Sequence, residues 1–99
     1  MRLTEHEIQI IRDTAHEVFG QNIRIILFGS RVDDSAKGGD IDLMIETSEE
    51  VDRPALFSAR VASRVSRSLS GRAVDVVLKA PNLKTQPIHD IATQSGIVL

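Results

Sequence analysis

The sequence contains no cysteine, tryptophan or tyrosine, and its three phenylalanines bring the aromatic content to only 3% of 99 residues. The lack of cysteine excludes disulfide bonds and thiolate metal sites, and it is typical of proteins from a reducing compartment. Because aromatic side chains are scarce, the core must be built from the aliphatic residues that dominate the 41% hydrophobic fraction.

Long apolar runs are also missing, and no stretch has the length that a membrane-spanning helix needs. The first residues include acids in a helix-start pattern and do not resemble a secretory signal peptide. We therefore expect a cytoplasmic protein with no membrane partner. A net charge of -2 argues against direct nucleic-acid binding driven by overall charge. The length predicts one domain, residues 1–99.

The spacing of the apolar residues predicts an alternation of helices and strands. Thr4 and Glu7 form a capping box at the start of the first helix, and Pro54 suits the first turn of the second. Residues 97–99 form a tail or a short edge strand. The order α-β-β-α-β-α predicts an α+β fold, a small mixed β-sheet with helices packed mainly on one face. The predicted helices span roughly residues 4–19, 54–70 and 88–95, and the strands span roughly 23–28, 41–46 and 74–79.

Three aspartates lie on the second and third predicted strands. Asp40 and Asp42 are two residues apart, so their side chains point to the same face, and Asp75 interrupts the apolar strand "VDVVLK". If these strands pair, three carboxylates converge, and a bound Mg²⁺ offsets their mutual repulsion. Two such ions can clamp the attacking and leaving oxygens of a phosphoryl-type displacement. A lone Asp-x-Asp is more often an ordinary turn or cap.

The loop between the first two strands begins with Gly-Ser-Arg. Gly29 lets a ligand approach the backbone closely, and Ser30 offers a hydroxyl and an N–H to phosphate oxygens. Arg31 and Lys37 can neutralise polyphosphate charge. By itself Gly-Ser-Arg is more often a plain turn than a phosphate site. The P-loop, dinucleotide and EF-hand patterns do not fit this sequence.

The combination of these features is more specific than its parts. A strand, Gly-Ser, a loop, Asp-x-Asp on the next strand and an Asp on a third strand resemble the nucleotidyltransferase fold of the DNA polymerase beta superfamily. With the motifs "GSR" and "DIDL" and its short length, the chain resembles the minimal nucleotidyltransferases. Many of these are antitoxin partners of HEPN-domain ribonuclease toxins. The resemblance covers nearly the whole chain.

This resemblance implies a Mg²⁺-dependent transfer of a nucleoside monophosphate, AMP from ATP or another NMP from its NTP, to a hydroxyl of a partner protein. It assigns the triphosphate to Gly29 and Ser30, and both metal ions to Asp40 and Asp42. It assigns the catalytic metal and the deprotonation of the acceptor to Asp75. The implied partner is a HEPN-family toxin, bound in a hetero-oligomer or by a homodimer. In that family the modified residue is a tyrosine of the toxin, and this chain has none.

Two alternatives stay open at this stage. The domain can neutralise a toxin by docking alone, with a weak or inactive site. The acidic loop at Asp33 and Asp34 motivates that view, as does a stripe formed by Arg60, Arg64 and Arg67, which otherwise reads as a solvated helix face. A transferase acting on tRNA or an antibiotic is less favoured, because such enzymes usually recruit a further helical domain to hold the acceptor.

Overall fold

The computed structural model describes residues 3–29, 41–84 and 86–99. Among these residues, no helix is long and apolar enough to cross a membrane. Thr4 caps the first helix as predicted, because its hydroxyl accepts from the Glu7 N–H while the Glu7 carboxylate accepts from the Thr4 N–H. The elements in chain order are α1 (Glu5–Phe19), β1 (Ile23–Phe28), β2 (Ile41–Thr47), α2 (Pro54–Ser68), β3 (Val74–Lys79), α3 (Pro87–Ser95) and β4 (Ile97–Val98).

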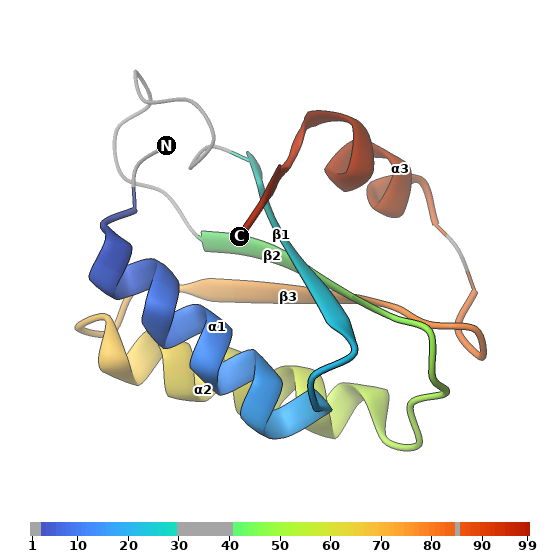
Figure 1. Ribbon diagram of the computed structural model, residues 1–99, viewed down its shortest axis with the longest axis horizontal. Coiled ribbons are helices and arrows are strands. Elements are labelled where there is room, and N and C mark those ends of the chain that lie inside the picture. Colours follow the sequence, from blue (N-terminus) through green and yellow to red (C-terminus); the bar gives the residue numbers. More distant parts are fainter. Residues whose placement is uncertain (1–2, 30–40, 85) are drawn as a thin grey trace.

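The four strands form one mixed sheet in the order β3-β2-β1-β4. β1 runs antiparallel to β2 and β4, whereas β2 and β3 are parallel and are joined through α2. The predicted α+β class is confirmed, and β4 is the short edge strand that was one of two expectations for the C-terminal residues. Figure 1 shows α1 and α2 on one side of the sheet and α3 on the other, so the helices lie mainly, but not all, on one face.

Each face of the sheet has its own apolar cluster. Alternate strand residues such as Leu27, Leu43 and Ile45 pack with Ile11 of α1 and Val65 of α2 in the larger cluster. The intervening residues face α3, where a smaller cluster is formed by Ile26, Phe28, Met44 and Ala92, with Val77 and Ile88 against it. β2 is therefore buried on both faces over most of its length, and only its polar positions interrupt this burial.

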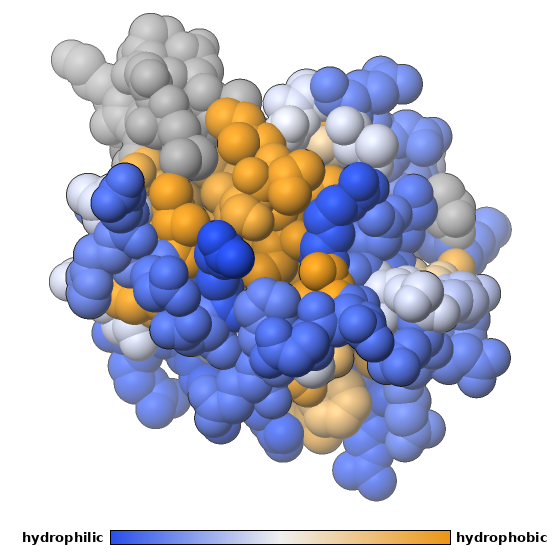
Figure 2. All heavy atoms as spheres, viewed as in Figure 1, coloured by the Kyte–Doolittle hydropathy of each residue, from blue (hydrophilic) through white to orange (hydrophobic). Residues whose placement is uncertain are grey.

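In Figure 2 apolar side chains gather in the upper half of the view, whereas the lower half, over α1 and α2, is mostly hydrophilic.

Asn82 ties the connection after β3 to the connection before α2. Its side-chain oxygen accepts from the Val51 N–H at 3.0 Å, and its amide donates to the Val51 carbonyl at 2.9 Å. Val51 is buried, so its backbone groups depend on this side chain rather than on water. The pair holds together two segments that are 31 residues apart.

We expect Asn82→Ala to lower the free energy of unfolding by about 1–3 kcal/mol, because it leaves a buried donor and a buried acceptor without partners. Urea denaturation followed by circular dichroism measures the loss. Asn22→Ala is the matched control, because Asn22 is also an exposed asparagine in a connection, and it should change stability by less than about 0.5 kcal/mol. Equal losses in the two variants would contradict the role given to Asn82.

Candidate active site

The sheet brings Asp42 and Asp75 side by side. Asp42 pairs in register with Asp75 of β3 and with Phe28 of β1. In-register neighbours on adjacent strands point to the same face and lie about 5 Å apart. Asp42 and Asp75 therefore share the face of the sheet that carries α3, opposite α1 and α2. Asp42 is half-buried and Asp75 is exposed, so the pair is reached from solvent at this end of the strands.

Gly29, directly after β1, completes this corner of the sheet. Its φ of +76° lies in the left-handed region, which favours glycine. A Cβ at this position would collide with the Asp42 carboxylate, and the Cγ of Asp42 would be only 3.1 Å away. The absence of a side chain at Gly29 thus makes room for the carboxylate of Asp42. The sequence predicted a close approach at this glycine, but it did not indicate that a carboxylate of the same chain occupies the space.

The donor set of this corner suits a hard divalent cation. Two carboxylates on one face supply the oxygen ligands that Mg²⁺ prefers, and Gly29 makes room for one of them. Among the described residues, no group of three or more histidines, aspartates or glutamates is placed to hold a metal. The third predicted ligand, Asp40, lies outside the described residues, as do Ser30, Arg31 and Lys37. Two of the three predicted carboxylates are thus brought together, and they fit the ion.

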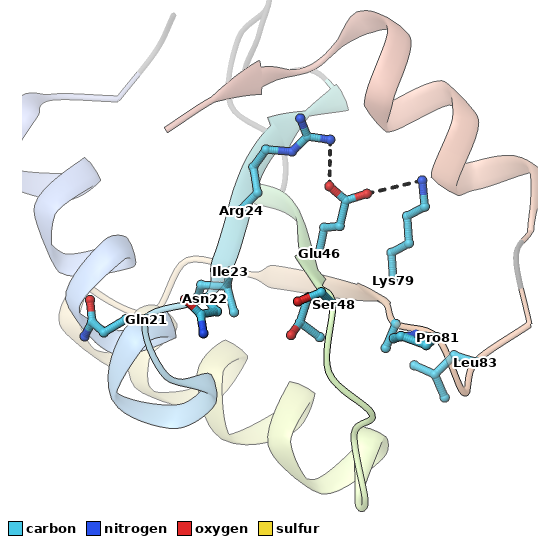
Figure 3. A pocket seen from close by; sticks show the side chains of 11 residues that line it. Gln21, Asn22, Ile23, Arg24, Glu46, Ser48, Lys79, Pro81 and Leu83 are labelled. Carbon is cyan, nitrogen blue, oxygen red and sulfur yellow. Dashed lines mark ion pairs between the residues drawn. The ribbon is translucent and has the colours of Figure 1, made fainter.

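A groove of about 750 Å³ lies at the opposite ends of the same strands. Figure 3 shows Glu46 between Arg24 and Lys79, to which it is paired at 2.6 Å and 3.3 Å. Glu46 is four residues from Asp42 along β2, which places the groove roughly 13 Å from the aspartate pair. Its charged groups are two cations and one carboxylate, and they lie away from the predicted metal ligands Asp42 and Asp75. Sequence reasoning did not find it, since its residues come from three strand ends and three connections.

Comparisons with known proteins agree with this fold. The family model of the nucleotidyltransferase domain matches residues 8–99. A chain in a crystal structure of the toxin–antitoxin pair MntA–HpeT, in a mutant with two aspartates changed to glutamate, superposes with a TM-score of 0.66 at 18% sequence identity. The match covers 97% of the present chain and 72% of that chain, and it confirms the expected fold. No significant match was found among curated proteins. On the strength of the family model, which spans nearly its whole length, this chain belongs to the nucleotidyltransferase domain family.

Proposed function

We propose that the chain transfers a nucleoside monophosphate, AMP from ATP, to a hydroxyl of a partner protein in a reaction that depends on Mg²⁺. The observation that carries the proposal is the in-register pair of Asp42 and Asp75 beside Gly29, in a chain of the nucleotidyltransferase domain family. The pair lies next to Gly29, the residue at which the Gly-Ser-Arg sequence begins, and this supports a role of its carboxylates in metal binding.

Each site residue has a role in this proposal. Asp42 and Asp75, with Asp40, hold two Mg²⁺ ions, which when bound offset the charge of the triphosphate and of the leaving pyrophosphate. Gly29 and Ser30 bind the triphosphate through the backbone and the hydroxyl. Arg31 and Lys37 neutralise phosphate oxygens that the carboxylates would otherwise repel.

The transfer balances without any further reactant. The acceptor oxygen forms a bond to the α-phosphorus of ATP, and the bond from that phosphorus to the bridging oxygen of the β-phosphate breaks. The hydroxyl proton passes to the Asp75 carboxylate and then to water, and pyrophosphate leaves with the electron pair of the broken bond. Because Asp75 is exposed near the start of β3, an acceptor on another protein can reach it.

The acceptor is proposed to be a toxin of the HEPN type, with this chain acting as its antitoxin. The similar crystal structure is of a toxin–antitoxin pair, and the two aspartates changed there are two positions apart, as Asp40 and Asp42 are here. An acceptor hydroxyl on a partner protein is therefore favoured over a hydroxyl on a tRNA or an antibiotic.

Intact-mass spectrometry of the partner tests this proposal. The product of the adjacent reading frame, expected to be an all-helical chain with an Arg-x4-6-His motif, is incubated with the purified chain, ATP and Mg²⁺. We expect the partner mass to rise by one or more adenylate groups, and we expect no change when EDTA removes the metal. If no nucleoside triphosphate produces a mass change in the presence of Mg²⁺, the proposed transfer is wrong.

A further inference from the structure

The charge of this chain is divided unevenly between α2 and the rest of the molecule. Residues 53–73 contain five arginines and no acidic residue. The other 78 residues contain seven basic and fourteen acidic residues, so a chain of net charge -2 carries +5 on this one segment. A solvated helix normally mixes both signs of charge on its exposed face. α2 therefore differs from an ordinary surface helix.

Three of these arginines form a stripe along α2, which we call the arginine stripe: Arg60, Arg64 and Arg67. At 100° per residue they fall within about 60° of one another around the helix axis and span about 10 Å along it. All three are exposed. Arg64 is paired with Glu17 of α1 at 3.1 Å, whereas Arg60 and Arg67 form no ion pair with any residue in the described part of the chain.

The stripe costs the isolated chain some stability. Like charges three and four residues apart on a helix repel one another. Arg53 adds a cation at the N-cap, where a side-chain hydrogen bond is absent and the first turn has no acid to complement the helix dipole. A negatively charged surface placed against α2 would turn this repulsion into attraction.

The face around the stripe has the composition of a protein interface. All five basic residues of the segment are arginine, the residue preferred for paired carboxylates at interfaces. Arg60 is ordered by stacking on the Phe57 ring, with Cζ 5.7 Å from the ring centroid. Leu56, one turn before Arg60, is 43% exposed and offers an apolar anchor.

We infer that the arginine stripe with Leu56 is a docking surface for an acidic face of a partner protein. Charge complementarity identifies the occupant. Two guanidinium groups of the stripe have no carboxylate partner among the described residues, although Arg67 donates to the Ser63 hydroxyl, and guanidinium groups bind carboxylates in a bidentate manner. RNA is the less favoured occupant. The face has no tyrosine or tryptophan to stack on bases, and its Phe57 ring is already covered by Arg60.

This surface is separate from the candidate active site. α2 packs on the face of the sheet opposite to the one that carries Asp42 and Asp75 (Figure 1). Binding at the stripe and transfer at the aspartates can therefore fail independently, and the inference does not need the proposed function to be right. It gives the chain a second contact surface, distinct from the face that carries Asp42 and Asp75.

Fluorescence anisotropy of labelled probes at low and high salt tests the inference on the full chain. The probes are a 20-residue polyglutamate peptide and a 20-nucleotide oligouridylate. The stripe variant is Arg60→Gln with Arg67→Gln, and the control variant is Arg12→Gln with Lys84→Gln, which removes the same charge from exposed positions elsewhere. We expect the stripe variant to bind polyglutamate at least about tenfold more weakly at low salt, while the control variant binds it within about twofold of the parent chain.

The same measurements define what would overturn the inference. Equal losses of polyglutamate affinity in the stripe and control variants would show that binding depends on overall surface charge and not on the arginine stripe. Tighter binding of oligouridylate than of polyglutamate, lost in the stripe variant, would assign the surface to RNA. Self-association of the parent chain at low salt that disappears in the stripe variant would make a second copy the occupant. The circular dichroism spectrum and the urea midpoint should be unchanged in both variants, which confirms that both remain folded.

Discussion

Asp42→Asn is expected to lower the rate of nucleotide transfer to the partner at least about 100- to 1,000-fold while leaving the fold intact. The amide has nearly the shape of the carboxylate, so it still fits the space at Gly29 and leaves the pairing of β2 with β1 and β3 undisturbed. It removes one negative charge, and one oxygen that the proposed function assigns to Mg²⁺, from the pair that Asp42 forms with Asp75. Mg²⁺ binding should therefore weaken, and the stabilisation of the leaving pyrophosphate should weaken with it.

Single-turnover transfer of labelled AMP, measured over a range of Mg²⁺ concentrations, checks this result. Asp13→Asn is the control, because Asp13 is an exposed acid on α1 whose side-chain oxygen accepts from Gln9, a bond that asparagine can keep. Full transfer by Asp42→Asn would rule out the proposed chemistry. If the variant loses transfer but still protects cells from the toxin, the chain neutralises its partner by docking alone.

Much of the fold could be predicted from local patterns. The β-branched runs at 23–28 and 74–79 gave strand bounds that the structure reproduces, and the Thr4–Glu7 box marked the start of α1. These features depend on side-chain chemistry within a few residues, which a single sequence displays. The shared face of Asp42 and Asp75 also followed from alternation, once β2 and β3 are neighbours in register.

Features that depend on contacts between distant segments could not be predicted in this way. The path of the chain after β3 places α3 on the face of the sheet opposite to α1 and α2. The apolar pattern of the α3 sequence would be the same if the helix packed on the other face. The close approach of Gly29 and Asp42 joins the end of β1 to β2 across the loop. The groove at Glu46 combines three strand ends, so no single stretch of sequence contains a signal for it.

Gly29→Ala is expected to lower transfer at least about 100-fold, with a stability loss of only about 1–2 kcal/mol. Two effects act at this position. The left-handed φ of +76° strains any residue with a Cβ, and this strain accounts for the loss in free energy of unfolding. The added methyl group also displaces the carboxylate of Asp42, and a displacement of about 1 Å at a catalytic group costs roughly two orders of magnitude in rate.

Gly71→Ala separates these two effects. Gly71 has a φ of +79°, is also exposed, and has no atom within 4 Å of the position that a Cβ would occupy. The two variants should therefore lose similar stability in urea denaturation, but only Gly29→Ala should lose transfer. Equal activities would show that Asp42 tolerates the methyl group and that the glycine serves only the backbone turn. A loss confined to Gly29→Ala would show that this glycine helps to position a metal ligand, because backbone strain is common to both variants and the contact with Asp42 is not.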